Sequence, residues 1–500
     1  MLVYAVDIGT TNLKVVLYDG GLRRLSTASA PAVYRRDGVR VEFDPEGLFD
    51  SLLDLVSECA TAAAVGTEDS VIALTGQAES LVLLDAHGRP VRAGLSWLDD
   101  RAVDQAAELE ERFGADEAFA ITGEPFPSAT WPAAKLRWLK RYEPATTSAT
   151  RSILMVKDYI AYRLTGALVG EVSTRGFTYL WDVRDGSYWD EMTAFCGVPE
   201  GSLPPVVPAG TDLGPVLDEV AGRLPPGASY RVNVGALDHF CAMAGTGSYA
   251  PHRVSESAGT VLSLSMLATG WHFDPARKVS FHAGLRPGEI VLFNGVDGGG
   301  AALDWFRREG LDGMPYADLE RQLASREHAQ PPMFLPYLTG VNPPDFFPGA
   351  KGAFLDLDLG HDRIDLAYAV EEGIALLLRR NVDYLAPTRP EAIVSTGGGA
   401  ASPFWNQLKA DACGVEVVVP DELEATCRGA AALALVAAGV LGDVGEATAS
   451  APPSSRRYLP SSRERADARY ARFADYLGRL YASRPDPYPA DPHPTTKDER

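Results

Sequence analysis

The sequence predicts an α/β protein of two domains with a duplicated architecture. Its 500 residues, of which 46% are hydrophobic, are more than a single hydrophobic core usually holds. Short apolar runs typical of strands alternate with longer amphipathic stretches typical of helices along most of the chain. A strand, a turn of glycine and threonine, and a second strand occur around Gly9 and again around Gly259. Together these observations favour two similar α/β halves.

The chain opens with a predicted hairpin whose strands are residues 2–6 and 13–18. Its turn can be purely structural. In the functional interpretation, Gly9 admits a phosphate close to the backbone, and Asp7 at the strand end holds Mg²⁺ through water, because hard cations prefer oxygen ligands. Hydroxyl, amide and N–H donors for the phosphate then come from three neighbours: Thr10, Thr11 and Asn12.

A second polar turn lies between apolar strands at residues 71–74 and 81–84, after an amphipathic helix. It contains Gln77 and Glu79, groups suited to orienting a polar ligand, although an exposed loop without a role is an equal alternative. Residues 173–182, further along, are expected to form a polar loop. Helices are predicted over four stretches of this half: 45–64, 102–113, 132–139 and 157–164.

The central turn of the chain ends at Asp238 and follows a predicted strand over residues 230–234. Its sequence is Gly-Ala-Leu-Asp, and a run of small residues up to Gly245 comes next. The carboxylate can simply cap the following helix, or it can face a ligand that approaches the backbone closely. Because glycine- and hydroxyl-rich turns recur on both sides, each after a β-like run, we favour the second interpretation.

The second half repeats the scheme of the first. Gly259 and Thr260 form the turn between two strand-like runs, so a nucleotide is expected between the halves. Glycine triplets at 298–300 and 397–399 each stand between a strand and a helix, where helix N–H groups can face an anion. Long helices are predicted over 365–384, 403–413 and 462–482, and the proline-rich tail beyond Ser483 is expected to be disordered.

Composition and charge exclude several classes of function. A net charge of −21 argues against a nucleic-acid partner, although backbone amides can still hold an anionic nucleotide. Five cysteines without a CxxC motif indicate reduced thiols in a cytoplasmic protein. The chain begins directly with a strand, so we expect no signal peptide, and its longest apolar run, 430–440, is too short to span a membrane.

Nine motifs occur in order over nearly the whole chain apart from the tail. They are Asp7-Ile8-Gly9-Thr10-Thr11, Gly76-Gln77-Ala78-Glu79, Trp97-Leu98-Asp99-Asp100-Arg101, Lys135-Leu136-Arg137-Trp138-Leu139, Gly235-Ala236-Leu237-Asp238 with Gly245, Ala258-Gly259-Thr260, Gly299-Gly300-Ala301-Ala302-Leu303-Asp304-Trp305, Asp365-Leu366-Ala367-Tyr368-Ala369-Val370-Glu371, and Gly397-Gly398-Gly399-Ala400. Each is weak by itself, but the ordered set resembles the FGGY carbohydrate kinase family, which includes xylulokinase, glycerol kinase and gluconokinase.

The resemblance implies two actin/hexokinase-like (ribonuclease H-like) domains with a central cleft that closes over sugar and ATP. It places an N-terminal, sugar-binding domain over residues 1–247 and a C-terminal, nucleotide-binding domain over residues 248–445. Residues 446–500 would be a C-terminal helix and tail. The implied cofactors are ATP and Mg²⁺, and a homodimer is possible in this family.

The resemblance also assigns roles to residues. Asp238 would be the general base, and Asp7 would act through Mg²⁺. The sugar would be bound by five residues: Gln77, Glu79, Trp97, Asp99 and Asp238. The phosphates would be held by Gly9, Thr10, Thr11, Asn12, Gly259 and Thr260, and the ribose and adenine by Gly300, Gly398, Gly399 and Ala400.

One departure from the family bears on the substrate. Xylulokinases usually carry Met-His after the glutamine, and glycerol kinases carry Arg-Glu, whereas this chain has Ala78-Glu79. A carboxylate without the basic partner favours a neutral polyol or ketose over an acid sugar. We expect a kinase for a pentulose, with glycerol, a tetritol or another ketose as alternatives. A non-catalytic regulator and an actin-like ATPase are further alternatives.

Overall fold

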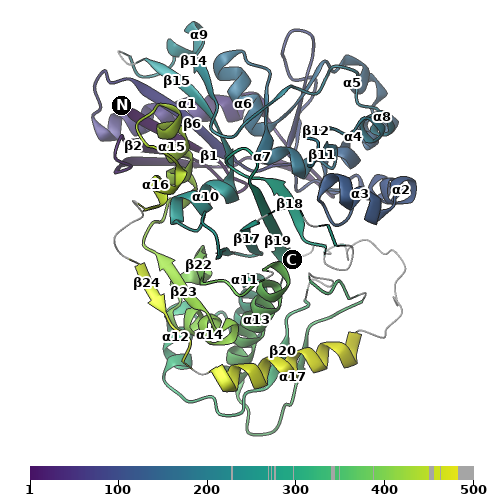
Figure 1. Ribbon diagram of the computed structural model, residues 1–500, viewed down its shortest axis with the longest axis vertical. Coiled ribbons are helices and arrows are strands. Elements are labelled where there is room, and N and C mark those ends of the chain that lie inside the picture. The colour runs from purple at the N-terminus through teal and green to yellow at the C-terminus, as the bar shows by residue number, and fades with distance from the viewer. Residues whose placement is uncertain are drawn as a thin grey trace. The chain divides into compact units, whose positions relative to one another are not determined.

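The computed structural model describes most of the chain and divides it into two compact units (Figure 1). Unit 1 comprises Met1–Tyr249, Leu267–Leu292 and Glu422–Ala451, and unit 2 comprises Ala250–Met266, Phe293–Asp421 and Pro452–Arg500. The residues described within them are 1–226, 229–268, 270–271, 273–274, 278–296, 298–338, 344–347, 349–386, 388–449, 455–461 and 463–481. The predicted disordered tail and Asp297 lie outside these residues.

The units differ from the domain boundaries expected from the sequence. A C-terminal segment, Glu422–Ala451, belongs to unit 1, because its helix α15 (Ala425–Ala437) packs on strands of the N-terminal sheet. The sequence predicted that the chain passes from the first domain to the second once, near residue 247. It could not show that the chain later returns to the core of the first domain, because such a return leaves no local signal in the sequence. The boundaries drawn from the resemblance stay a prediction.

The core of unit 1 is a mixed sheet whose parallel strands end at one edge. Its strand order is β14-β15-β6-β1-β2-β3, with β1 parallel to β6 and β6 parallel to β15. Nearly every residue of β1 and β6 is buried because helices cover both faces. The strands are β1 (Leu2–Ile8), β2 (Asn12–Asp19), β3 (Arg24–Pro31), β6 (Ser70–Gly76), β14 (Asp212–Pro215) and β15 (Tyr230–Leu237).

Helices α1 and α6 pack on one face of this sheet, and α10 and α15 lie against its strands as well. The start of α1 follows directly from the sequence. Asp44 accepts a hydrogen bond from the backbone N–H of Glu46, and Pro45 occupies the first turn. The helices of this layer and its margins are α1 (Pro45–Ala63), α6 (Val156–Thr165), α9 (Asp218–Ala221), α10 (Asp238–Thr246) and α16 (Val444–Ala449).

A second sheet in unit 1, of order β4-β5-β8-β7-β9, packs with short helices around a separate apolar cluster. Its strands are β4 (Tyr34–Asp37), β5 (Arg40–Phe43), β7 (Leu81–Leu84), β8 (Gly94–Leu95) and β9 (Ser152–Met155). The remaining elements are α2 (Val103–Phe113), α3 (Ala115–Thr122), α4 (Pro132–Tyr142), α5 (Pro144–Ala149), α8 (Asp190–Cys196), β10 (Gly170–Glu171), β12 (Ser187–Tyr188), β13 (Val206–Val207) and β18 (Ser280–Ala283).

The expected polar loop over residues 173–182 is wrong. The segment forms α7 (Val172–Arg175), a 3₁₀ turn (Gly176–Thr178) and β11 (Trp181–Asp182), and most of it is buried. Several of its polar side chains have partners inside the protein, and Glu171 caps α7 by accepting a hydrogen bond from the backbone N–H of Ser173. Ser173 Oγ also accepts from the N–H of Leu237, 64 residues away, and local composition cannot reveal such a tertiary partner.

Unit 2 has its own sheet, in which the strands run in the order β19-β17-β16-β22-β23-β24. Lys409 of α14 forms an ion pair with Glu256 of β16 (2.7 Å), and both side chains are fully buried. The strands are β16 (Arg253–Ala258), β17 (Leu262–Ala268), β19 (Ile290–Val296), β22 (Ala392–Thr396), β23 (Glu416–Pro420) and β24 (Ser455–Tyr458), with a separate pair β20 (Met333–Leu335) and β21 (Ala353–Leu355). Its helices are α11 (Gly300–Gly310), α12 (Tyr316–Ala324), α13 (Arg363–Leu385), α14 (Pro403–Cys413) and α17 (Arg463–Tyr481).

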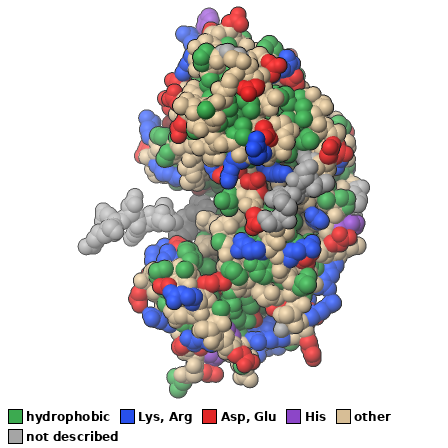
Figure 2. Space-filling model, turned by 90° about the vertical axis from the view of Figure 1, so that its left-hand side faces the viewer, with side chains coloured by type: hydrophobic (Ala, Val, Ile, Leu, Met, Phe, Trp, Pro, Cys, Tyr) green, Lys and Arg blue, Asp and Glu red, His purple; other side chains and the backbone are tan. Residues whose placement is uncertain are grey.

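Several expectations from composition are met. All five cysteines are free and buried. Within the part of the chain that the structure describes, no helix combines the length and apolarity needed to cross a bilayer. On the face drawn in Figure 2, basic side chains are scattered among acidic ones.

Candidate active site

Three parallel strands of unit 1 end side by side, and each continues into a predicted site residue. Ile8 at the end of β1 pairs with Gly76 of β6, and Gly76 pairs in turn with Leu237 of β15. The residues that follow are Gly9, Gln77 and Asp238. The carboxyl ends of neighbouring parallel strands in open α/β sheets are where ligands bind.

Asp238 is the first residue of α10 and is half-buried. Its Oδ1 accepts a hydrogen bond from the backbone N–H of His239 at 2.6 Å. Burial raises the pKa of the Asp238 carboxyl above its usual value, although His239 opposes the shift. A carboxylate with a raised pKa is a better proton acceptor than an ordinary surface aspartate.

Asp7 lies in β1, two residues before Gly9. Its Oδ1 is buried and has no hydrogen-bond partner in the protein. Burial and then the charge of Asp238 raise the pKa of Asp7 to about 7, while Lys14 lowers it. The side chain of Lys14 is itself bound to Glu424 at 2.6 Å.

An orphaned buried carboxylate oxygen is the kind of group that a hard cation satisfies. Among the described residues there is no group of three or more His, Cys, Asp or Glu side chains that could hold a metal. A lone carboxylate suits Mg²⁺, which keeps several waters and uses few protein ligands together with phosphate oxygens. Asp7 therefore fits the cation that the sequence implied.

The turn after β1 offers polar groups to solvent. The Gly9 N–H donates to the carbonyl of Asn12 at 3.1 Å, and a Cβ at Gly9 would lie 2.8 Å from that same oxygen, so glycine is required. Thr11 and Asn12 are exposed. Thr10 Oγ1 accepts a hydrogen bond from Trp97 Nε1 at 2.9 Å. This bond joins a residue predicted to bind the sugar, Trp97, to one predicted to bind the phosphates, Thr10.

The turn after β6 carries Gln77 and Glu79. The Gln77 amide Nε2 donates to the hydroxyl of Tyr34 (3.3 Å), and its Oε1 accepts from Ser80 (3.3 Å). Glu79 is half-buried and has a positive φ of 65°, an uncommon backbone conformation for a non-glycine residue. Such local strain is frequent at functional sites.

Lys135 is a positive charge that acts on the Glu79 carboxyl. Burial raises the pKa of Glu79 while Lys135 lowers it, and burial lowers the pKa of Lys135 while Glu79 raises it. The Lys135 ammonium is fully buried and donates to the carbonyl of Thr130 at 2.6 Å. A basic residue of α4, distant in sequence, thus influences the Glu79 carboxyl, and the local Ala78-Glu79 comparison could not show it.

A further buried carboxyl, Glu124, was not among the predicted site residues. Burial raises its pKa well above the usual value, Ser280 opposes the shift by donating to Oε2 at 2.9 Å, and the charge of Glu79 adds to it. His282 Nε2 lies 3.4 Å from Glu124 Oε1 in an orientation that makes no hydrogen bond. The His282 ring stacks on Phe177 with centroids 3.9 Å apart, and burial lowers its pKa to about 3.

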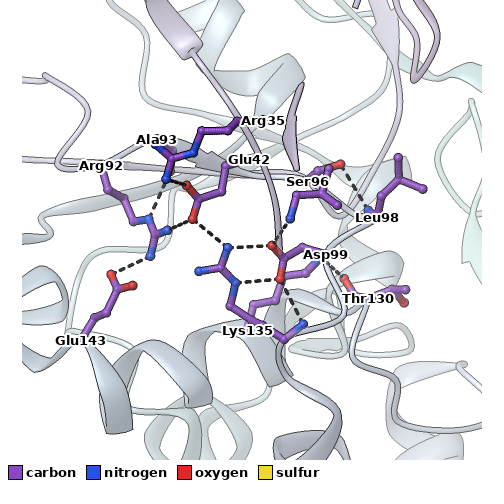
Figure 3. A network of polar contacts seen from close by, with 12 residues as sticks. Arg35, Glu42, Arg92, Ala93, Ser96, Leu98, Asp99, Thr130, Lys135 and Glu143 are labelled. Atoms are coloured by element: carbon purple, nitrogen blue, oxygen red, sulfur yellow. Dashed lines mark hydrogen bonds and ion pairs between the residues drawn. The ribbon is translucent and has the colours of Figure 1, made fainter. Parts of the chain in front are cut away.

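Asp99 is held by protein groups on both carboxylate oxygens (Figure 3). Oδ2 accepts from the backbone N–H of Val41 (2.6 Å) and from Arg101 (2.7 Å), and Oδ1 accepts from Arg101 Nε (2.7 Å). Arg101 also reaches Glu42 at 2.7 Å, and Glu42 binds Arg92 in turn. This network fastens the loop of Trp97 to β5, so the Asp99 carboxylate supports the loop through protein contacts.

The nucleotide residues predicted in unit 2 are brought together by two turns. The N–H of Gly300, at the start of α11, donates to the carbonyl of Gly259 at 2.9 Å. A Cβ at Gly399 would lie 3.0 Å from the Cβ of Ala258, so the turn after β22 packs on the turn after β16. Thr260 and Gly398 remain exposed, and Ala400 is buried.

A surface hollow of about 890 Å³ lies elsewhere in unit 1. It lies among β5, the end of α6 and the loop after β7, and Arg35, Glu42, Glu46 and Arg163 are among its lining residues. None of the predicted site residues lines it. The carboxylates of the predicted site, Asp7, Glu79 and Asp238, therefore lie outside this hollow.

The comparisons with known proteins identify the family. Residues 2–245 match the N-terminal domain and residues 257–438 the C-terminal domain of the FGGY family of carbohydrate kinases. The chain is 30% identical over 424 residues to a xylulose kinase of Klebsiella pneumoniae (82% of this chain, 85% of that one) and 29% identical over 493 residues to a glycerol kinase of Delftia acidovorans (94% and 97%). A solved structure of a xyloylose kinase from Brucella ovis superposes with a TM-score of 0.88 at 27% identity, covering 96% of this chain and all of that one.

These matches span nearly the whole chain and both units, and they confirm the family and the actin/hexokinase-like fold that the motifs implied. An FGGY kinase is a phosphotransferase that uses an alcohol group as acceptor. The chain belongs to the FGGY family of carbohydrate kinases.

Proposed function

We propose that this kinase transfers the γ-phosphoryl group of ATP to a hydroxyl of a pentulose, with Asp238 as the general base. The observation that carries the proposal is the juxtaposition of Asp238 with the strand ends that bear Asp7 and Gln77. Phosphoryl transfer needs little covalent chemistry from the protein, so aligning the acceptor hydroxyl and neutralising charge account for most of the catalysis.

Asp238 would accept the proton that the sugar hydroxyl loses as its oxygen bonds to phosphorus. The raised pKa of Asp238 supports this role, because a base whose pKa lies closer to the working pH holds the proton more readily. At the start of α10, the backbone N–H of His239 binds Oδ1 of Asp238, so Oδ2 would be the oxygen that accepts the proton.

Asp7 would hold Mg²⁺, as its unpartnered Oδ1 suggests. The cation would offset negative charge on the phosphates of bound ATP. Thr10, Thr11 and Asn12 would contribute donors beside it. In unit 2, the turns of Gly259 and Thr260 and of Gly398 to Ala400, together with Gly300, would hold the remaining parts of the nucleotide.

The substrate class is inferred from Glu79 and Lys135 and from the relatives. A carboxylate accepts hydroxyl hydrogen bonds, and the buried Lys135 ammonium, already bound to the carbonyl of Thr130, is poorly placed to bind the carboxylate of an acid sugar. This favours a neutral ketose or polyol. A pentulose comes first because of the xylulose kinases among the relatives, and the alternative of glycerol or a tetritol is supported by Glu79, which replaces the usual histidine of xylulokinases.

The test is a coupled ADP-release assay with Mg²⁺-ATP across pentuloses, hexuloses, glycerol, tetritols and aldonic acids. A pentulose should give the highest kcat/KM. Asp238→Asn should nearly abolish turnover while the Kd for the sugar, measured by calorimetry, changes little. Turnover of glycerol or a tetritol alone would replace the substrate assignment, and sugar binding without turnover by the wild type would indicate a non-catalytic regulator. Undiminished kcat in Asp238→Asn would refute its role as base.

A further inference from the structure

The strand that delivers Asp238 is interrupted by a β-bulge. In the pairing of β15 with β6, Asn233 lies opposite Ala73 and Ala236 lies opposite Thr75, so two residues of β15 face one of β6. Val234 and Gly235 are the two residues that lie opposite Leu74. A bulge changes the direction in which the following side chains point, and it removes backbone groups from the ladder.

Gly235 is the residue that permits the bulge. Its φ of +61° is left-handed, and a Cβ at this position would lie 1.5 Å from the carbonyl oxygen of Leu74. Its N–H donates to the side chain of Asn233 (2.9 Å), and its carbonyl accepts from the N–H of Gly210 (2.9 Å). The backbone N–H and carbonyl groups at the bulge therefore form hydrogen bonds with groups that are not part of β6.

Two of these partners are buried side chains from neighbouring elements of unit 1. Lys157 of α6 donates from Nζ to the carbonyl of Val234 at 2.9 Å. Ser173 of α7 accepts at Oγ from the N–H of Leu237 at 2.9 Å. Both side chains are completely buried, and their two hydrogen bonds fall on either side of Gly235.

Glu171 joins these two side chains. Its Oε2 accepts from Ser173 Oγ at 2.7 Å and lies 3.4 Å from Lys157 Nζ. Because the Ser173 hydroxyl donates its hydrogen to Glu171, its oxygen lone pair can accept from the N–H of Leu237. Burial raises the pKa of Glu171, and Lys157 and the donors of Ser173 oppose that shift. We call Lys157, Glu171 and Ser173 the bulge clamp.

We propose that the bulge clamp positions the general base, with Lys157 and Ser173 as positioning residues that fix the backbone immediately before Asp238. This inference rests on the proposed role of Asp238. Each of these two residues holds one backbone group of the turn, and neither is assigned a contact with substrate. A misplacement of a reacting group by about 1 Å costs on the order of 10²-fold in rate, so a loosened turn should act on kcat.

The test compares Ser173→Ala with Thr174→Val. Thr174 is the next residue of α7 and is equally buried. Its hydroxyl donates to the main-chain carbonyl of Glu171 (2.8 Å) and accepts from Arg175 (3.2 Å), and neither partner is a backbone group of β15. Both variants lose one buried hydroxyl. Ser173→Ala should lower kcat about 10²-fold with little change in the KM for ATP, while Thr174→Val keeps kcat within a few-fold of the wild type. Ser173→Cys, which keeps the shape but accepts more weakly, should give an intermediate kcat and serves if Ser173→Ala does not fold.

Amide hydrogen exchange of peptides covering 230–241 supplies a readout that does not depend on activity. Exchange in this segment should accelerate in Ser173→Ala and remain unchanged in Thr174→Val at matched melting temperature. Unchanged exchange, or an equal loss of kcat in both variants, would overturn the clamp. A wrong assignment of the proposed function would give a different result. Asp238→Asn would then keep full activity, or the wild type would be inactive while the difference in hydrogen exchange between Ser173→Ala and Thr174→Val is still observed.

Discussion

Replacing Asp7 with asparagine should stabilise the fold while abolishing catalysis. Burial, followed by the charge of Asp238, raises the pKa of Asp7 from 3.8 to about 7. At pH 8 the folded protein must therefore keep a charged carboxylate in a place that disfavours it, and the unfolded chain does not. Asparagine has nearly the same shape and carries no charge, so the substitution removes this cost.

The magnitude and the sign follow from proton linkage. Between about pH 4 and pH 7 the folded state binds a proton at Asp7 that the unfolded state has released, so this group makes stability fall as pH rises. The difference between a pKa of 3.8 and one of about 7, at 1.36 kcal/mol per pKa unit, sets an upper limit of about 4 kcal/mol on the gain in unfolding free energy at pH 8. Since the residue is only half-buried and solvent relaxes around it, we expect a gain of about 2 to 4 kcal/mol at pH 8 and almost none at pH 4.

The assay is urea unfolding from pH 4 to pH 8 with EDTA present, because Mg²⁺ bound to the folded protein would mask the effect. Asp19→Asn is the control, because it should change the unfolding free energy in the opposite direction. Partial burial of Asp19 is outweighed by hydrogen bonds from Arg23 and Gly21, which lower its pKa, so its replacement should destabilise at pH 8. A stability difference between wild type and Asp7→Asn that is independent of pH, or a loss of stability at pH 8, would refute the reasoning.

Two other outcomes are expected. The acid limb of the pH profile of kcat/KM should move to lower pH when the Mg²⁺ concentration is raised, because the cation competes with the proton at Asp7. An acid limb that does not change with Mg²⁺ concentration would mean that Asp7 does not bind the metal. Gly235→Ala should cost about 4 kcal/mol or more in urea unfolding, because its Cβ would meet the Leu74 carbonyl. Gly439→Ala, also at positive φ (71°) but in open space, should cost only about 1 to 2 kcal/mol, and equal costs would mean that the bulge is not tightly packed.

Local signals predicted much of the fold. The helix expected over 45–64 spans Pro45–Ala63 because Asp44 and Pro45 form a start that acts within one turn. The helix expected over 403–413 is found at Pro403–Cys413, capped by Ser402 and ended by Gly414 in the left-handed conformation. Patterns of this kind are read from neighbours in the sequence, so the chain reports them directly.

The site was predicted in part, and the limit has a physical origin. The turns of Gly9, Gln77 and Asp238 were recognisable because glycine and polar residues interrupt apolar strands. Their adjacency depends on which strands pair, and that information is not local. Glu124 and Ser173 were missed for the same reason, since Glu124 gains its partner from a segment 156 residues away and Ser173 from one 64 residues away.

The helix α15 also governs when the N-terminal unit can be completed. Because α15 packs on β1, β6 and β15, these strands lack part of their cover until residues 425–437 leave the ribosome. At about 5–20 residues per second, the interval after Tyr249 is roughly 10 to 35 seconds. During that time a sheet with exposed apolar residues has to be kept from aggregating, which makes the nascent chain a natural client for chaperones. A stop codon anywhere before α15 would leave unit 1 incomplete, although it would remove only C-terminal sequence.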